Sequence, residues 1–456
     1  MNQRAKLTAF LAFLTVVSHE TVAQTKIQVF TKLLYYDGLS AAQPRTVPPS
    51  VLNLRNDLYA AKLTQAQLDQ IQDSLNLLVT IGAACDIYDR IGNVNLVLVN
   101  KGDTSYKPGK GIDVTGNNGP LTGEAKVPKW IEVARFITPF TDKAVKPDTV
   151  PFSYPISNIA RILKDTALSS KYDFWIELQV FGLLLPQAPC PGRTDVFQGS
   201  LQLITQGGAA SSNNDLLMPL ASHAIFNNFM AEGTDTLGKT TKTIPFSLTA
   251  KVDNAMLYLI ASNHGSNTGG EEYIRRKHNV YVDNKLVFSY TPGGKSCEPY
   301  RVYNTRTNGI YQASPQPDSY WLGFNNWCPG DVIPIRAIAV GSLAAGNHTF
   351  QITVPGAVFQ DKQGNFPFSV YLQAKASNAS ALMEFRRDPH APIGGHPETE
   401  SIERVTVYDL AGKIIFTGNR LPGDAWTRKP GIYWVRTLHK NKTEATIMQV
   451  LVSTRN

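Results

Sequence analysis

Apolar and polar residues alternate over many short stretches of this chain. This period predicts β-strands, because successive strand side chains point to opposite faces of a sheet. The clearest stretches, separated by Gly, Pro, Asn and Asp, are 173–181, 256–260, 279–282, 286–290, 349–354 and 368–374. Many short strands between turn residues favour packed antiparallel sheets over an alternating α/β fold. Asp283 and Asn284 tolerate positive φ, so they predict a tight hairpin between two of these strands.

Helical patterns are few, and polar stretches break the strand pattern at two places. The best helix covers residues 63–71, with Thr64 as its N-cap. Stretches 206–214 and 386–397 have the composition of linkers, and the two histidines of the second lack partners for a metal site. These breaks predict an N-terminal domain over 24–208, a second domain over 213–380, a linker over 381–400 and a small β module over 401–456.

The first 23 residues have the layout of a secretory signal peptide. A short basic start precedes an apolar run over 7–17, and Thr21-Val22-Ala23 offers small residues for cleavage. Neither this run nor any later segment is long enough to span a bilayer as a helix. We therefore expect an exported protein that passes through the periplasm and is secreted or held at the cell surface.

The formal charge of +8 comes from 44 basic and 36 acidic residues that are scattered along the chain. This distribution predicts a solubilising surface and lacks a nucleic-acid-binding signature. The four cysteines are widely spaced, which excludes a zinc ribbon or a Cys-x-x-Cys redox motif. Export permits disulfides. Cys297 and Cys328 flank one loop and are the best pair, whereas Cys85 and Cys190 either form a second bridge or stay free.

Two carboxylates lie three residues apart at Asp86 and Asp89, on either side of Tyr88 and directly before Arg90. Burial would raise the pKa of such a carboxyl group and the adjacent cation would lower it, so the cluster is suited to acid–base chemistry. The same cluster is also typical of a surface turn or a structural ion-pair network. Further motifs favour the first alternative.

Four more motifs accompany this cluster and its following Asn93-Val94. They are, in chain order, Glu132 with Arg-Phe-Ile-Thr-Pro-Phe at 135–140, the strand 174–182 with Glu177, the stretch 269–278 with Glu272 and His278, and Trp-Cys-Pro-Gly at 327–330 with Pro-x-Arg at 334–336. Together these motifs resemble the bacterial peptide-N-glycosidase F family across residues 25–380.

The resemblance implies an all-β fold of two tandem antiparallel eight-stranded jelly rolls, with an active cleft at their interface and no cofactor or metal. It implies hydrolysis of the amide bond between an N-linked glycan and asparagine, which releases the glycan and converts Asn to Asp. Three acids would meet in the cleft. Asp89 would activate or orient water, Glu272 would assist proton transfer or polarise the amide, and Glu177 would bind substrate or a bridging water.

Further site residues follow from the same motifs. The substrate-binding residues would be Arg90, Asp86, Tyr88, Tyr273 and Trp321, with His278 and Arg276 as supporting residues. The arginine would hold charge and fix the local geometry, and the aromatic rings would stack on sugars. The histidine is expected to be a structural partner rather than a catalyst.

The chain departs from the family pattern at its glycan-contacting rim. Phe324 stands where the family's type member has an arginine, and Gln179 replaces an aromatic residue two positions after Glu177. A tryptophan expected near 262–265 is absent, with His264 nearby, and two family cysteines are missing. The acidic residues are kept, so the resemblance indicates reaction type better than substrate preference.

The tail carries a second resemblance. Strand-like stretches at 405–415 and 431–436, with Asp-Leu-Ala-Gly-Lys at a predicted hairpin turn, are similar to the C-terminal sorting domain of the Bacteroidetes type IX secretion system. Such a domain is a small β-sandwich, and the resemblance implies the type IX machinery as a partner. A generic β-sandwich domain is the alternative.

Two other functions fit a double jelly-roll fold. A non-catalytic glycan-binding protein is favoured by the altered rim, and opposed by the joint presence of Asp89, Arg90, Glu177 and Glu272. A copper monooxygenase ranks last, because the eight histidines include no His-His or His-x-His pair. The expected partner is an N-glycosylated peptide or protein, and the expected state is a monomer without nucleic acid or a membrane span.

Overall fold

The computed structural model describes residues 24–103, 129–184, 190, 192–209, 215–226, 235–236, 239–266, 270–359, 364–376, 402–408, 414–418, 431–439 and 446–452. The expected signal peptide over 1–23 and the expected linker over 381–400 lie outside these residues. The chain divides into two compact units, Met1–Ala391 and Pro392–Asn456. No helix in the described part is long and apolar enough to cross a membrane.

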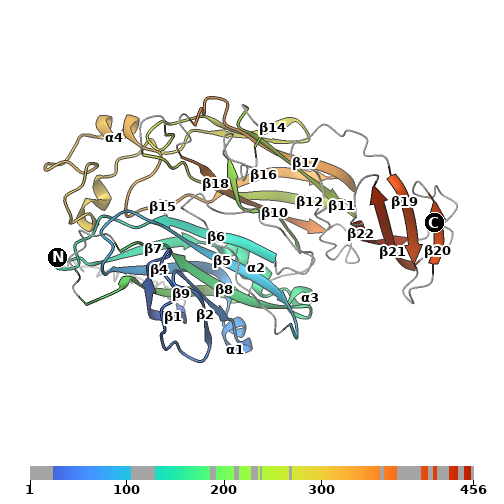
Figure 1. The fold of residues 1–456 in the computed structure, drawn as a ribbon, viewed down its shortest axis with the longest axis horizontal. Helices are drawn as coiled ribbons and strands as arrows, with labels where there is room; N and C mark the ends of the chain where they lie inside the picture. The colour runs from blue at the N-terminus through green and yellow to red at the C-terminus, as the bar shows by residue number, and fades with distance from the viewer. Residues whose placement is uncertain are drawn as a thin grey trace, which may run out of the picture. The chain divides into compact units, whose positions relative to one another are not determined.

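Two sheets form the first half of the larger unit (Figure 1). The four-stranded sheet has the order β1 (Thr25–Tyr36), β9 (Asp195–Ala209), β4 (Gln72–Ala83) and β7 (Thr149–Pro155). The six-stranded sheet has the order β15 (Val332–Ile333), β6 (Lys129–Ile137), β5 (Ile91–Asn100), β8 (Tyr172–Val180), β3 (Leu58–Lys62) and β2 (Val51–Arg55). In β7 exposed and buried residues alternate at every position, as expected for a strand with one face on a core.

Two four-stranded sheets form the second half of this unit. One has the order β10 (Asp215–Phe226), β18 (Phe366–Ala376), β12 (Val252–Ala261) and β16 (Arg336–Leu343). The other has the order β11 (Thr241–Leu248), β17 (Gly346–Thr353), β13 (His278–Val282) and β14 (Lys285–Tyr290). All of these neighbours pair antiparallel.

The strand count differs from the prediction in the first half only. The second pair of sheets contains the predicted eight strands, whereas the first pair contains ten in the described part, because β2 and β15 extend the two ends of the six-stranded sheet. In each half the first strand lies beside the last, β1 beside β9 and β10 beside β18. The larger unit is therefore a double β-sandwich built from distant segments.

Each sandwich encloses its own apolar core, and a smaller cluster joins the two. In that cluster, Ile91 and Ile137 of the first sandwich lie with Ile260, Trp327 and Ile333 from the second half of the chain. Strand β15, which also comes from the second half, pairs with β6 of the first sandwich. The two sandwiches thus meet close to the first residue of β5.

Two local predictions are confirmed. Asp283 and Asn284 have φ of 49° and 63° in the turn between β13 and β14, as a hairpin of this type requires. Helix α1 (Gln65–Asp69) begins after Thr64, whose hydroxyl accepts a hydrogen bond from the Gln67 N–H at 3.2 Å. The Gln67 side chain accepts one in return from the Thr64 N–H, at 2.9 Å, which completes a capping box.

The predicted linker over 206–214 is wrong in its first part. Residues 206–209 continue β9, with Gln206 opposite Ser74 and Ala209 opposite Gln72. Pairing with β4 supplies backbone hydrogen bonds, and this tertiary contact overrides the turn-like composition of the segment. Residues 210–214 lie outside the described part.

Short helices connect the strands at the edges of the larger unit. They are α2 (Ser157–Leu163), α3 (Thr166–Ser169), the 3₁₀ helix η1 (Glu298–Tyr303) and α4 (Asp318–Phe324). In the smaller unit, the described residues form one antiparallel sheet in the order β20 (Ile414–Gly418), β19 (Ile402–Tyr408), β21 (Gly431–His439) and β22 (Thr446–Val452).

Candidate active site

Asp89 lies in the loop that connects β4 to β5, where the two sandwiches meet. The backbone of the next residue, Arg90, is held by Thr138 at the end of β6. The Arg90 N–H donates to the Thr138 hydroxyl at 2.7 Å, and the Thr138 N–H donates to the Arg90 carbonyl at 2.8 Å. Asp89 as a residue is half-buried.

The Arg90 guanidinium is held by Asp86. Its Nε donates to Asp86 Oδ2 at 2.7 Å and its Nη2 donates to Oδ1 at 3.4 Å. The same carboxylate accepts the backbone N–H groups of Tyr88 and Leu183, at 2.9 and 2.7 Å. Asp86 is 1% exposed, so its carboxylate is placed to orient the arginine, and its contact with a substrate stays a prediction.

Glu272 lies in the segment between β12 and β13 of the second sandwich. The Gly265 N–H donates to Glu272 Oε2 at 3.0 Å, and the Glu272 N–H donates to the Gly265 carbonyl at 3.3 Å. The Asn326 side-chain amide donates to the carbonyl of Glu271 at 3.0 Å and to that of Glu272. These bonds fix both the backbone and the carboxylate of Glu272.

The charges of Asp89 and Glu272 influence each other across the boundary between the sandwiches. Burial first, and the Glu272 charge second, raise the pKa of Asp89 from 3.8 to about 8, although Arg90 opposes this. Burial also raises the pKa of Glu272, against the Gly265 N–H and the Tyr273 side chain. Two like charges in one partly desolvated place cannot both form easily at neutral pH. The structure thus brings together two of the three predicted acids.

Glu177, the third predicted acid, lies elsewhere on the six-stranded sheet. It is fully buried in β8 opposite Asn95 of β5. The Asn95 amide donates to one carboxylate oxygen at 3.0 Å, and the Trp130 indole N–H donates to the other at 3.2 Å. Asn95 lies four residues beyond Ile91, about 13 Å along the strand at the usual rise. Glu177 is therefore part of a buried polar contact apart from the Asp89–Glu272 pair.

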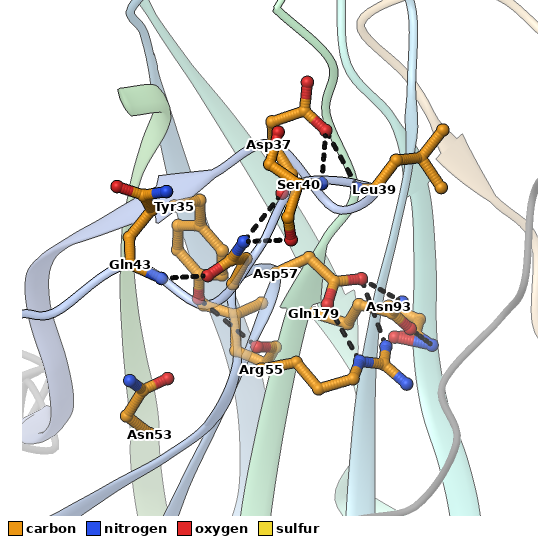
Figure 2. Close-up of polar contacts among 12 residues, drawn as sticks. Tyr35, Asp37, Leu39, Ser40, Gln43, Asn53, Arg55, Asp57, Asn93 and Gln179 are labelled. Carbon is orange, nitrogen blue, oxygen red and sulfur yellow. Dashed lines mark hydrogen bonds and ion pairs between the residues drawn. The ribbon is translucent and has the colours of Figure 1, made fainter. Parts of the chain in front are cut away.

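Gln179, predicted at the altered rim, is instead buried and belongs to a chain of polar groups (Figure 2). Its Nε2 donates to Asp57 Oδ2 at 2.7 Å, and its Oε1 faces the Asn93 amide at 3.3 Å. Arg55 donates to both oxygens of Asp57 at 2.9 and 3.1 Å. An aromatic ring could not replace these hydrogen bonds, so the change from an aromatic residue serves this polar chain.

The predicted aromatic residues divide into exposed and buried ones. Tyr88 is 46% exposed, with the Arg90 guanidinium 5.4 Å from the centre of its ring. Tyr273 is half-buried, and its ring lies 5.5 Å from that of Phe324. Trp321 is 1% exposed, and its indole N–H donates to Glu298 at 3.0 Å. Trp321 therefore offers no face to a sugar, because α4 turns it into the protein interior.

The two supporting residues have structural contacts. Arg276 pairs with both carboxylate oxygens of Glu271, at 2.7 and 3.2 Å. His278 Nδ1 lies 2.9 Å from the Arg276 carbonyl, and its ring stacks on Tyr290 and Phe366. Burial lowers the pKa of His278 to about 4, so the ring is neutral at neutral pH. Both residues support the segment that carries Glu272.

Both possible disulfides are present. Cys297 and Cys328 are bonded, and their sulfurs pack with Trp321 and Tyr311 in a buried cluster. Cys85 and Cys190 form the second bridge, which resolves the alternative that the sequence left open. Among the described residues, no three His, Cys, Asp or Glu side chains are arranged to hold a metal ion.

Sequence reasoning missed three groups that hold the acids in place. Thr138 holds the loop of Asp89, while Gly265 and Asn326 hold Glu272. Thr138 lies in the Arg-Phe-Ile-Thr-Pro-Phe string, and Asn326 lies directly before Trp-Cys-Pro-Gly. Their nearness to these motifs was the available signal, although spacing alone does not show which loop each one contacts.

Two family models match the chain in order. The model described as the N-terminal part of Peptide-N-glycosidase F matches residues 26–182, and the model of its C-terminal part matches residues 234–373. The matched residues together make up well over half of the chain. A search of curated proteins found no match.

Solved structures of PNGF-II share the fold at low sequence identity. A structure of PNGF-II in the C2 space group has a TM-score of 0.56 and 19% identity, with 80% of this chain covered. A second crystal form, in P21, has a TM-score of 0.56, 20% identity and 78% coverage. This chain covers 66% of the PNGF-II chain in both. PNGase F, a glycosylasparaginase from Flavobacterium meningosepticum, has a TM-score of 0.48 and 14% identity, with coverages of 78% and 97%.

Proposed function

Because the chain belongs to the peptide-N-glycosidase F family, we propose that it hydrolyses the amide bond between an N-linked glycan and asparagine. The observation that carries this proposal is the pair of carboxylates, Asp89 and Glu272, contributed by different sandwiches. Amide hydrolysis needs a base for water and a proton for the departing nitrogen. Asp89 can supply both, as the base that takes a proton from water and then as the acid that passes it to the nitrogen.

In the proposed reaction, Asp89 takes a proton from a water molecule as the water oxygen attacks the side-chain carbonyl of the glycosylated asparagine. The carbon–nitrogen bond then breaks, and the same proton passes to the nitrogen, which leaves as a glycosylamine. The peptide keeps an aspartate. A base whose pKa lies near the working pH is the most effective, and the pKa of about 8 for Asp89 meets this condition.

Arg90 is the proposed cation for the oxygen that becomes negative during the attack. Its hydrogen bonds to Asp86 use Nε and Nη2, so Nη1 is left to donate to a substrate oxygen. Because Asp86 fixes the plane of the guanidinium, little rearrangement accompanies charge development. Tyr88 and Tyr273 each neighbour one of the two acids in sequence, and we assign them to the sugar rings.

Incubation of the purified protein with an N-glycopeptide, followed by mass spectrometry of the peptide, tests the proposal. Release of the whole glycan with conversion of Asn to Asp supports the amidase. A peptide that retains one core sugar would instead identify an endoglycosidase.

A non-catalytic glycan-binding protein is the second candidate, because the exposed ring of Tyr88 offers a sugar-stacking surface that needs no catalysis. The same glycopeptide separates the two functions. Saturable binding without any change in peptide mass, at several pH values between 6 and 9, would replace the amidase with the binding protein.

The proposed location is outside the cytoplasm, and the two disulfides agree with an oxidising compartment. The proposed role of the smaller unit is sorting by a type IX secretion system. Its described residues form one four-stranded antiparallel sheet, which is compatible with a small β-sandwich.

A further inference from the structure

Strand β6 and the residues just after it reach toward both acids. Thr138, one residue beyond the strand, holds the Arg90 backbone and thereby the loop of Asp89. Arg135, three residues earlier, points across the boundary to the second sandwich, where its Nη1 donates to the Ser262 hydroxyl at 2.9 Å and to the Pro367 carbonyl at 2.6 Å. One short segment therefore contacts both halves of the site.

Arg135 is itself fixed by a buried ion pair. Its Nε and Nη2 donate to the two oxygens of Glu132 at 2.8 and 2.7 Å, and both side chains are fully buried. The planar guanidinium and the carboxylate match each other in this two-bond arrangement. Its direction toward Ser262 is thus set by the pairing with Glu132.

Ser262 connects Arg135 to the segment that holds Glu272, because its hydroxyl contacts both Arg135 and His264. The Ser262 oxygen lies 2.7 Å from His264 Nε2. Because a guanidinium only donates, the serine oxygen accepts from Arg135 and its hydrogen is free to be donated to Nε2. His264 also pairs with Asn365 through two backbone hydrogen bonds of 2.9 and 3.1 Å. The next residue, Gly265, donates to the Glu272 carboxylate.

We propose that Arg135 and Ser262 are positioning residues, which set the separation of Asp89 and Glu272 through the chain Arg135–Ser262–His264–Gly265. Neither residue touches Asp89 or Glu272. The measurement of turnover rests on the proposed function, whereas the measurement of the Asp89 pKa does not. Removal of the Ser262 hydroxyl would free the segment around Gly265 and let Glu272 move away from Asp89.

Several charged groups face the two acids, and the test must separate them. Asp89 experiences Glu272, Arg90 and Asp86. Glu272 faces Asp89, the Tyr273 side chain and the Gly265 N–H. Of these, Glu272, Tyr273 and Gly265 are carried by the second sandwich, and Asp89, Arg90 and Asp86 by the first. If Glu272 alone moves away from Asp89, Arg90 and Asp86 stay in place. The pKa of Asp89 should then fall, because the Glu272 charge that raises it is more distant.

The decisive measurement is a carboxyl ¹³C NMR titration of Asp89 in the full chain, with Asp89→Asn used to assign the signal. Wild type should titrate at about pH 8. Ser262→Ala should lower the midpoint by about one unit, because a like charge moves away. His264→Ala breaks the same chain at a partly exposed residue, so it should act in the same direction and serves if Ser262→Ala does not fold.

Ser369→Ala is the matched control. Ser369 is also 2% exposed and also contacts the buried ion pair, through Glu132, but its other partner is the backbone of His223. This control should leave the midpoint at the wild-type value, and Ser262→Thr, which keeps a hydroxyl, should restore it. Equal shifts in Ser262→Ala and Ser369→Ala, or no shift in Ser262→Ala and His264→Ala, would overturn the proposal.

Turnover provides a second readout. On a glycopeptide, Ser262→Ala should lower kcat roughly tenfold or more, as a small displacement of a catalytic group does, with little change in KM. If wild type shows no turnover on any N-glycopeptide, the proposed function fails, while the NMR titration still decides on the positioning role.

Discussion

At the scale of single residues, the site depends on what Asp89 and Glu272 do to each other. Both pKa values are raised by burial, and the charge of Glu272 raises that of Asp89 further. The pair therefore holds one proton in the neutral range and loses it as the pH passes about 8. Because the two groups titrate together, the observed midpoints belong to the pair. Two predictions follow at this scale.

Asp89→Asn should abolish deglycosylation, with a loss of roughly 10²- to 10⁴-fold, because an amide of the same shape cannot accept the proton of water. The release of glycan from a glycopeptide measures the loss. The thermal unfolding midpoint is the control and should stay at or above that of wild type, because the substitution removes a half-buried carboxyl group whose charged form is disfavoured by burial. Near wild-type turnover would show that another residue activates water.

The activity of wild type should rise with pH through about 8, since the base must be unprotonated to act. In Glu272→Gln the remaining activity should rise at a lower pH, because the charge that raises the pKa of Asp89 is gone. Profiles of kcat/KM between pH 5 and 10 measure both midpoints. An unchanged midpoint in Glu272→Gln would show that the two acids do not interact in solution.

At the scale of elements, short connecting segments decide which side chains face the substrate. Helix α4 buries Trp321 beneath the Cys297–Cys328 disulfide and leaves Leu322 exposed. The loop before β5 instead turns Tyr88 outward. The sequence predicted both Tyr88 and Trp321 as residues that stack on sugars. Only the packing of each element separates a core residue from a binding residue.

Tyr88→Ala should therefore raise KM about two- to tenfold, the value of one aromatic contact, without loss of stability. Trp321→Ala should leave KM unchanged and lower the free energy of unfolding by about 3–5 kcal/mol, as large core truncations do. Urea denaturation and steady-state kinetics on one glycopeptide measure both effects. A stable Trp321→Ala variant with a raised KM would show that Trp321 contacts the substrate.

At the scale of the whole molecule, local patterns predicted the elements and distant contacts decided the site. The alternation in β13, the Asp283-Asn284 turn and the Thr64 capping box are set by near neighbours. The pairing of β15 with β6 joins residues almost 200 positions apart, and no period along the chain signals it. The separation of Glu177 from the other two acids has the same cause, because it depends on the register of β8 against β5.

Truncation tests the organisation of the molecule. The larger unit contains Asp89, Glu272 and the groups that hold them, whereas the smaller one begins at Pro392. A chain that ends at Asn378 should fold and keep full glycopeptide activity, yet fail to reach the cell surface or medium of its native host. Turnover in vitro and cell fractionation check the two halves of this prediction. A misfolded, inactive product would show that the smaller unit is needed for the fold of the larger one.

The Cys85–Cys190 disulfide joins residues 105 positions apart. Cys85 directly precedes Asp86, the partner of Arg90. In a host that synthesises the protein in a reducing cytosol, the loop that carries Asp89 would lack this bond, while both apolar cores could still form. Such preparations would be β-rich and poorly active, and oxidative refolding would recover their activity. The redox history of each sample must therefore be matched before rates from different expression hosts are compared.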